Sequence, residues 1–436
     1  MHPALSNKNS SVPFWSSSRY EDQMKHLLTL AAFVPALVLG CVGSADAPTE
    51  ECESGFHDGG DGVCVEEGAC ASNFVVGSGG RCIGFSVEES VPRAMGTHSS
   101  TLIPDGTVLV GGGARSGPVD AYNTRFFRYD PADGSWSDAE SSRNSHGLGA
   151  GTVLLDTGRV LTASGFDGDS PHGRCETYDP ASNTWTATWP MEVPRTSFAV
   201  AALSQGRAIA IGGIDESIEE TDVVEVFDET TQRWSVTSPW GEANARKGMS
   251  TTVLENGDLL VTGGTTDLGS QDASDLVNRF DIDTESWSDL APMPNELASH
   301  TATLLLDGRV LVVGGSSNGA ARNFVFLYDP SLDEWERADS MRWTRYNHTA
   351  MRLDNGDVLI FGGNDEESAP STQIYVAEEG RIIDGPSVGY AGHHAAMSQL
   401  DDGSILVTGG CRTIYDGGWD IEWECVSDAY RFFVAP

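Results

Sequence analysis

A sevenfold repeat is the feature that most constrains how this 436-residue chain folds. Each copy has an apolar run, a Gly-bearing turn, a second apolar run and a polar loop, followed by an aromatic residue. In five copies a Trp stands seven residues after that aromatic residue. A period of about 50 residues is typical of arrays of supersecondary units. The second apolar runs end at Gly112–Gly113, Ser164–Gly165, Gly212–Gly213, Gly263–Gly264, Gly314–Gly315, Gly362–Gly363 and Gly409–Gly410. The aromatic positions are Tyr129, Tyr178, Phe227, Phe280, Tyr328, Tyr375 and Tyr430.

The residue types of the unit favour four short antiparallel strands. Asp307–Gly308 and Asn355–Gly356 lie between apolar runs and predict tight hairpins. A Gly doublet after an apolar run lets the backbone turn and approach a neighbour that a Cβ atom would block. Each small sheet needs neighbours on both faces, and radial repetition supplies them without long open edges. The repeat therefore predicts an all-β fold, a seven-bladed β-propeller over residues 84–436.

The two ends of the repeat indicate how the ring closes. The last copy stops after its third apolar run, so its fourth strand has to come from elsewhere. Phe85 precedes His98 by the same 13 residues that separate Trp335 from His348. We therefore expect residues 84–90 to supply the closing strand, with Phe85 in the place of the Trp.

The Gly doublet, the aromatic residue and the spaced Trp together resemble the kelch repeat, over residues 84–436. The resemblance implies a propeller and leaves the chemistry open, since kelch rings include enzymes, peptide-binding adaptors and carbohydrate-associated surface proteins. One branch, the copper-radical oxidases related to galactose oxidase, needs a Cys–Tyr crosslink, a second Tyr and two His ligands. No segment here matches that copper site. We predict no catalytic residue, no metal site and no cofactor, and keep a copper oxidase or another enzyme, such as a hydrolase, as the alternative.

The N-terminal region predicts export. Residues 27–40 form a 14-residue apolar run, which is too short to span a membrane but fits the apolar core of a signal peptide. We assign residues 1–40 to this signal, with Met24 as an alternative start.

The apolar run ends in Val-Leu-Gly-Cys, which resembles the lipobox of bacterial lipoproteins. The resemblance implies that Cys41 carries the lipid and that residues 41–50 form a tether. It also implies an anchor at the outer membrane or cell surface. Leu39 is bulkier than the usual residue of the motif, and a free secreted product is the alternative.

Six of the remaining seven cysteines predict disulfides rather than a metal site. Four lie within residues 51–83 in two matching units, and a polar segment of this size needs crosslinks to be stable. These four allow three pairings, among which the sequence does not choose. We also expect Cys411 to pair with Cys425, and Cys175 to be a buried free thiol. The four cysteines of the module are Cys52, Cys64, Cys70 and Cys82.

The loop between Cys411 and Cys425 is the most distinctive segment of the repeat. Tyr415, Trp419 and Trp423 stand there among carboxylates. Aromatic faces stack on sugar rings while carboxylates accept hydroxyl hydrogen bonds, so these three residues are candidates for glycan binding. The alternative is that they pack on the ring in place of the Trp missing from the last two copies.

Four arginines and four histidines recur near the start of the first strands. By resemblance to kelch adaptors the arginines are candidates for an anion-binding face, and the alternative is that they join blades through backbone carbonyls. For the histidines the repeat itself is a sufficient explanation. The residues are Arg143, Arg195, Arg246 and Arg345, and His98, His300, His348 and His394.

The net charge of the chain limits the classes of partner that it can bind. The chain has 64 Asp and Glu against 26 Lys and Arg, a net charge of −38. Such a surface repels phosphate backbones, which excludes nucleic acid, and membrane contact is left to the lipid anchor. We predict a monomeric binding or scaffolding protein for a glycan or protein at the cell surface. A purely structural component of the cell envelope is a further alternative.

Overall fold

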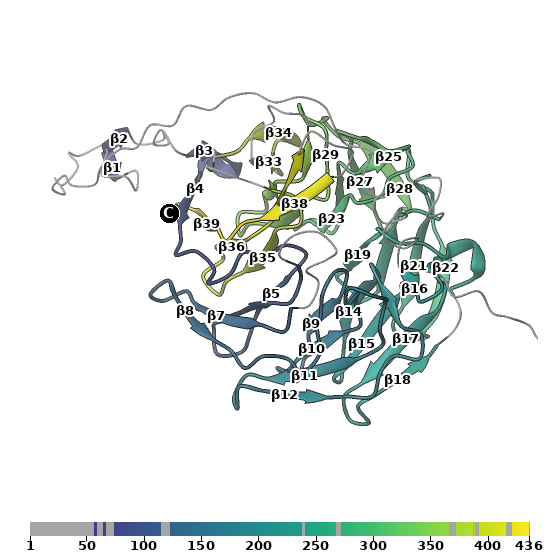
Figure 1. The fold of residues 1–436 in the computed structure, drawn as a ribbon. Coiled ribbons are helices and arrows are strands. Elements are labelled where there is room, and N and C mark those ends of the chain that lie inside the picture. Colours follow the sequence, from purple (N-terminus) through teal and green to yellow (C-terminus); the bar gives the residue numbers. More distant parts are fainter. Residues whose placement is uncertain are drawn as a thin grey trace, which may run out of the picture.

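In the computed structural model, the described part of the chain covers residues 56–58, 64–66, 74–114, 123–237, 240–266, 272–365, 372–386, 388, 392–415 and 421–435. These residues form seven β-sheets around a central axis (Figure 1). We call the sheets blades 1 to 7 in chain order. The all-β, seven-bladed propeller predicted from the repeat is confirmed.

Each blade has four antiparallel strands, which are arranged side by side in order from the centre of the ring to its rim. The innermost are β5 (Ser99–Leu102), β9 (Gly151–Leu154), β14 (Ala199–Leu203), β19 (Ser250–Val253), β23 (Thr301–Leu304), β30 (Thr349–Arg352) and β35 (Ala396–Gln399). The second strands are β6 (Val108–Gly111), β10 (Val160–Ala163), β15 (Arg207–Ile211), β20 (Leu259–Thr262), β24 (Val310–Val313), β31 (Val358–Phe361) and β36 (Ile405–Thr408).

The third and fourth strands complete the blades toward the rim. The third strands are β7 (Phe126–Asp130), β11 (Cys175–Asp179), β17 (Val224–Asp228), β21 (Val277–Asp281), β27 (Val325–Asp329), β33 (Thr372–Val376) and β39 (Ala429–Val434). The outermost are β8 (Ser135–Asp138), β12 (Thr184–Ala187), β18 (Arg233–Val236), β22 (Ser286–Asp289), β28 (Glu334–Arg337), β34 (Arg381–Asp384) and β4 (Cys82–Val87).

The repeated Trp joins neighbouring blades. Tyr328 pairs with Trp335 across β27 and β28, with ring centroids 4.7 Å apart. The indole N–H of Trp335 donates to the carbonyl of Ala291, in the segment after blade 4, at 2.9 Å. In blade 2, Trp185 packs on Phe126 of blade 1, with ring centroids 4.6 Å apart. An aromatic side chain buries about 150–250 Å², so the Trp positions hold each blade against the one before it.

The second and third strands supply most of the core between blades. Leu311 and Val313 of blade 5, for example, lie in one buried cluster with Ile360 and Tyr375 of blade 6. Each fully buried aliphatic side chain contributes about 1.5–3 kcal/mol relative to an exposed one. Because each sheet shares its core with its neighbours, the blades stabilise one another around the ring.

Blade 7 closes the ring with a strand from the N-terminal side. β39 pairs with β36 on one side and with β4 on the other, and Phe85 lies opposite Phe432 with ring centroids 5.7 Å apart. The closing strand and the place of Phe85 are thus confirmed, although β4 spans residues 82–87 rather than 84–90. The aromatic position of copy seven is corrected from Tyr430 to Phe432, because Phe432 is the residue that faces Phe85.

The N-terminal side adds two smaller pieces. β3 (Val75–Val76) pairs with β4 and makes the last sheet five-stranded. β1 (Phe56–Asp58) and β2 (Cys64–Glu66) form a hairpin in the segment predicted to be Cys-rich. Cys82 is disulfide-bonded, whereas Cys52, Cys70 and the side chain of Cys64 lie outside the described residues.

Residues 1–50, which include the predicted signal and Cys41, also lie outside the described residues. Within the described part, the helical pieces are 3-10 turns, Ser78–Gly80 and Glu242–Asn244, and no helix there is long and apolar enough to cross a membrane.

Candidate functional site

One end of the ring gathers the loops that follow the Gly doublets and the segments that connect successive blades. The second Gly of a doublet donates its N–H to the connecting segment: Gly213 to the carbonyl of Arg246 at 3.0 Å, and Gly315 to that of Arg345 at 2.8 Å. Gly213 has φ 96°, and a Cβ atom there would lie 2.7 Å from Phe198. Only glycine satisfies both demands without strain. The doublets therefore fix the loops of this end, which we call the loop face.

Three of the four candidate arginines are fully buried beneath the loop face. The guanidinium of Arg195 donates to the carbonyl of Gly212 at 3.1 Å and to the carboxylate of Glu225 at 2.6 Å. Arg246 donates to the carbonyl of Gly263 at 2.7 Å, and Arg345 to that of Gly362 at 2.7 Å. These contacts are those of the alternative role, in which the arginines join the connecting segments to the blades.

The pKa shifts of these arginines agree with their buried positions. Burial lowers the pKa of Arg246 to about 9, with the charge of Asp289 opposing the shift. Burial also lowers the pKa of Arg195, and the adjacent Glu225 carboxylate opposes that shift. The Arg246 guanidinium carbon lies 4.3 Å from the centre of the Trp240 ring. A guanidinium held by a carboxylate or an aromatic face inside the protein has no free donor fork for a bound anion.

Arg143 differs from the other three and is exposed. Its backbone N–H donates to the Glu176 carboxylate at 3.1 Å, and the ring of His146 lies 3.1 Å from the same carboxylate. Gly113 donates to the carbonyl of His146, just as Gly213 does to that of Arg246. The counterpart of the buried arginines in blade 2 is thus His146, and the equivalence expected for Arg143 is shifted by three residues.

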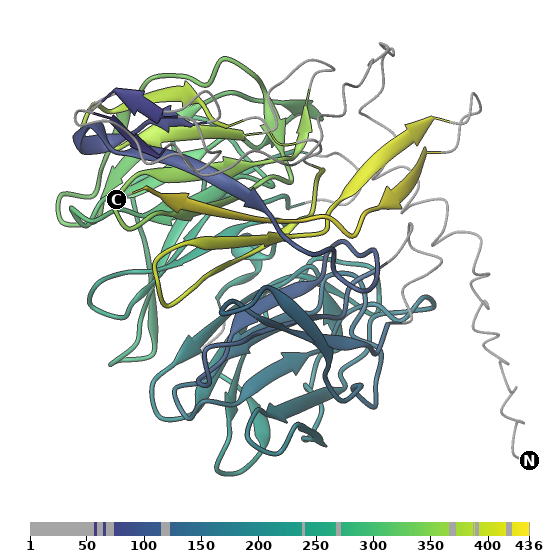
Figure 2. The same ribbon diagram turned by 90° about the vertical axis from the view of Figure 1, so that its left-hand side faces the viewer.

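The distinctive seventh loop forms a crosslinked hairpin. β37 (Cys411–Tyr415) pairs with β38 (Ile421–Cys425), and Cys411 and Cys425 form the expected disulfide. In the side view the hairpin extends beyond the sheets of the ring (Figure 2). Trp423 is half-buried, and its ring packs on those of His393 and His394 at 4.9 and 5.1 Å. Trp419 and the side chain of Tyr415 lie outside the described residues.

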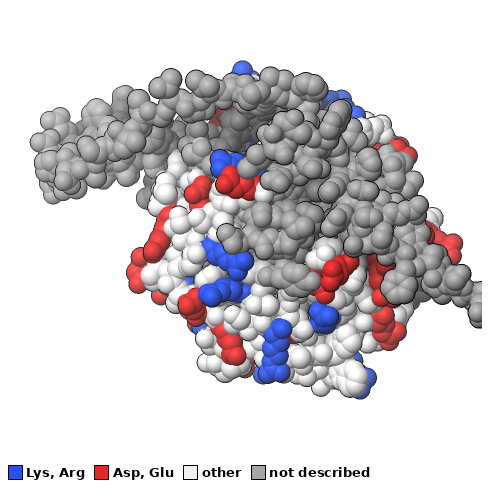
Figure 3. All heavy atoms as spheres, viewed as in Figure 1, with Lys and Arg blue, Asp and Glu red and all other residues white. Residues whose placement is uncertain are grey.

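Trp423 also reaches across to the neighbouring loops. It packs against a small buried cluster of Ala114, Leu148 and Phe166, which come from blades 1 and 2 and their connection. On the described atoms of this side of the molecule, basic and acidic side chains are interspersed (Figure 3). Among the described side chains of the hairpin, Trp423 is thus a half-buried aromatic residue within a surface of mixed charge.

The repeated histidines act between blades. His98 Nε2 lies 2.8 Å from the Thr408 hydroxyl of blade 7, and His300 Nε2 lies 2.8 Å from the Thr262 hydroxyl of blade 4. Burial lowers the pKa of His98 to about 3 and that of His300 to about 4, so both rings are neutral near pH 7. Among the described residues, no group of three or more His, Cys, Asp and Glu side chains is placed to hold a metal ion.

Cys175 is a buried free thiol, as predicted. Burial raises its pKa to about 12, so the thiol stays protonated. Its cluster contains Phe227 and Trp234, and no tyrosine belongs to it among the described residues. The surroundings of Cys175 therefore differ from those of a Cys–Tyr crosslink.

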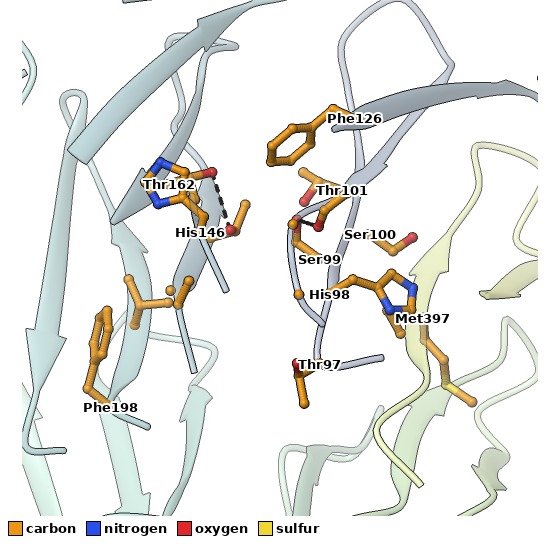
Figure 4. Close-up of a pocket in the computed structure, with 18 residues that line it drawn as sticks. Thr97, His98, Ser99, Ser100, Thr101, Phe126, His146, Thr162, Phe198 and Met397 are labelled. Carbon is orange, nitrogen blue, oxygen red and sulfur yellow. Dashed lines mark hydrogen bonds between the residues drawn. The ribbon is translucent and has the colours of Figure 1, made fainter. Parts of the chain in front are cut away.

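A cavity of about 310 Å³ lies near the axis between blades 1 and 2, and sequence analysis did not find it. Figure 4 shows Thr97, Ser99 and Thr101 on one side and Thr162 and Phe198 on the other. The lining comes from the inner strands of four blades, β5, β9, β14 and β35, and from the second and third strands of blades 1 and 2, which supply Phe126 and Thr162. No spacing rule links residues so far apart in the chain.

Comparison with known proteins yields matches to kelch proteins. Residues 197–376 match the family described as the KLHDC2/KLHL20/DRC7 Kelch-repeats domain. The chain is 30% identical to Kelch-like protein 35 of Mus musculus over 42% of its length, and 25% identical to Kelch-like protein 26 of Danio rerio over 55%. It spans 30% and 40% of the lengths of these two relatives.

Solved structures agree with the fold. The protein titled "Structure of YjhT" superposes with a TM-score of 0.53 at 16% identity, over 68% of this chain and 99% of that one. A copper complex titled as a novel fungal alcohol oxidase of the AA5 family superposes with a TM-score of 0.61 at 16% identity, over 83% of this chain and 77% of that one. At this identity the likeness concerns the propeller alone.

Proposed function

Because the chain is a kelch-repeat β-propeller, we propose that it is a non-catalytic recognition module that binds its partner through the loop face. The observation that carries the proposal is the crosslinked hairpin, which holds the half-buried ring of Trp423 against His393 and His394. Aromatic residues on rigid supports are common anchors of binding energy in interfaces. Kelch propellers commonly bind proteins, so a protein is the first candidate partner.

A glycan is the second candidate, on a separate observation. Trp423 offers an aromatic face, and the neighbouring Arg412 and Glu424 are about half exposed and form an ion pair on the same hairpin. Sugar rings combine apolar faces with hydroxyl groups, which such a surface satisfies. If no glycan binds in the assay, a protein remains the proposed partner.

The test uses the soluble chain from Val42 on a glycan and polysaccharide array and in photo-crosslinking to intact cells of the source. Trp423→Ala should reduce either signal at least tenfold, whereas Trp189→Ala, an exposed Trp away from the hairpin, should not. Triple replacement of Tyr415, Trp419 and Trp423 by Ala extends the test to the whole loop. Equal binding by parent and hairpin variants would exclude the hairpin as the site.

We also propose that the protein is exported and held at the cell surface by lipid on Cys41. Its support is the lipobox-like sequence that ends the apolar run at residues 27–40. Metabolic labelling with a radioactive fatty acid should mark the protein, and Cys41→Ala should abolish the label and release the chain into the medium. An unlabelled parent chain would refute the anchor and favour free secretion.

A further inference from the structure

The cavity between blades 1 and 2 has the composition of a ligand site rather than of a packing defect. Its 18 lining residues include eight Ser, Thr and His residues together with Phe126 and Phe198. Small-molecule sites combine apolar walls with a few polar groups and measure about 300–1,000 Å³. At about 310 Å³, partly open to solvent, this cavity has room for one small ring and for little more.

The lining has no ionisable side chain other than those of its two histidines. None of the residues around the cavity is Asp, Glu, Lys or Arg, in a chain with a net charge of −38. His98 is neutral near pH 7, and His146 turns its Nε2 to the buried Glu176 carboxylate. A charged ligand would be desolvated here without a partner, which is costly. The site therefore selects a neutral ligand.

The hydroxyl groups around the cavity retain hydrogen-bonding capacity. Thr152 donates to Thr162 at 3.3 Å, and Ser99 donates to the carbonyl of Gly111 at 3.1 Å. Among the described residues, the Thr101 hydroxyl has no hydrogen-bond partner. Each hydroxyl has one donor and two acceptor positions. The lining therefore both donates and accepts, which suits a ligand that is itself rich in hydroxyl groups.

Apolar groups complete the site. Phe126, Phe198, Val200 and Met397 line the cavity beside the hydroxyls (Figure 4). A sugar ring has hydroxyls around its edge and C–H groups on its faces, and so needs both kinds of wall. We propose that this cavity binds a single neutral sugar ring, either a free monosaccharide or the terminal unit of a glycan. None of its lining residues belongs to the hairpin of the proposed function.

Isothermal titration with neutral monosaccharides tests the proposal on the soluble chain from Val42. The panel contains a hexose, an N-acetylhexosamine and a pentose, with a hexuronic acid and an unacetylated hexosamine as charged comparisons. At least one neutral sugar should bind, and the charged ones at least tenfold more weakly. Methyl glycosides and oligosaccharides distinguish the two kinds of ligand. A site for free monosaccharides should bind a sugar more weakly once its anomeric carbon carries a glycosidic bond, whereas a site for the terminal unit of a glycan should bind it equally well.

Thr152→Val removes one hydroxyl at nearly constant volume and should weaken binding about tenfold, since a ligand hydroxyl then lacks a partner. Thr251→Val is the matched control, because Thr251 holds the same place in the inner strand of blade 4 and lies outside the cavity. Ala396→Met fills the space and should abolish binding in a chain that still unfolds cooperatively. No neutral sugar bound by the parent, or equal binding by parent and Ala396→Met, overturns the inference. Trp423→Ala should leave sugar binding in the cavity unchanged. The experiment can therefore refute the cavity proposal and the hairpin proposal independently of each other.

Discussion

At the scale of single residues, the ion pair of Arg195 and Glu225 is the most consequential contact of the loop face. Both side chains are fully buried. Glu225 also accepts the backbone N–H groups of Glu192 and Val193, at 2.7 and 3.1 Å. One carboxylate thus joins the third strand of blade 3 to the segment that leads into the blade.

Replacing Arg195 by Met should destabilise the protein by about 3–5 kcal/mol, because it leaves the buried Glu225 carboxylate without its cation. Arg143→Met removes an exposed arginine and should change the free energy of unfolding by less than about 0.5 kcal/mol. Urea denaturation followed by tryptophan fluorescence measures both. Equal midpoints for the two variants would mean that the buried pair contributes nothing to stability.

The buried histidines make stability depend on pH. The pKa of His98 is lowered to about 3 and that of His300 to about 4, against about 6.5 in the unfolded chain. Between these values the unfolded state binds more protons, so stability falls as the pH drops below about 6.5. At pH 5 each histidine should cost about 2 kcal/mol relative to pH 7. His300→Gln should reduce the difference between urea midpoints at pH 7 and pH 5, and an unchanged difference would contradict the assignment.

At the scale of elements, the buried carboxylate of Asp357 bonds the N-terminal segment to blade 6. Asp357 is fully buried and accepts the N–H groups of Ser78, at 2.8 Å, and Ala377, at 2.9 Å. In blade 4 the corresponding Asp258 instead pairs with Arg279 of its own blade. The hydroxyl and N–H of Ser78 thus take the place of an arginine, and they attach β3 and β4 to a second blade.

Asp357→Ala should release residues 74–81 and cost about 2–4 kcal/mol, since several buried donors lose their acceptor. Asp258→Ala is the matched control and should destabilise blade 4 without freeing that segment. Hydrogen exchange read by mass spectrometry distinguishes the two, with faster exchange over residues 74–87 expected only for Asp357→Ala. The same exchange in both variants would show that the attachment lies elsewhere.

The strand register shows which features of the fold can be predicted from the sequence. The strands, the Trp contacts and the place of Phe85 were predictable, because each feature recurs in the chain and has a local cause. The error at Tyr430 arose because copy seven has no Trp seven residues after its aromatic residue, and the hairpin β37–β38 separates its doublet from its third strand. Tyr430 and Phe432 are two residues apart and lie on the same face of the strand, which is why the pattern did not reveal the shift.

At the scale of the whole molecule, the candidate sites depend on contacts that the repeat does not encode. The burial of Arg195 is decided by Glu225, whereas the exposure of Arg143 follows from its place three residues before His146. The cavity combines hydroxyls of blades 1 and 2 with Ala396 and Met397 of blade 7, which reach it only once the ring has closed. A periodic sequence predicts what its copies share, and these sites are built from what the copies do not share.

Ring closure itself gives the last prediction. A chain that begins at Glu89 lacks β3 and β4, so β39 becomes an open edge and Phe432 loses its contact with Phe85. Exposed edge strands favour aggregation. The loss of β4 also opens the ring, and because neighbouring blades share their cores, an open ring is less stable as a whole. The truncated chain should unfold at lower urea concentration and aggregate on heating, whereas a chain from Phe74 should match the parent. A peptide of residues 74–88 added to the truncated chain should restore part of the midpoint by strand addition. Identical midpoints for the two truncations would show that closure by β4 is dispensable, and that the blade-to-blade cores alone hold the propeller.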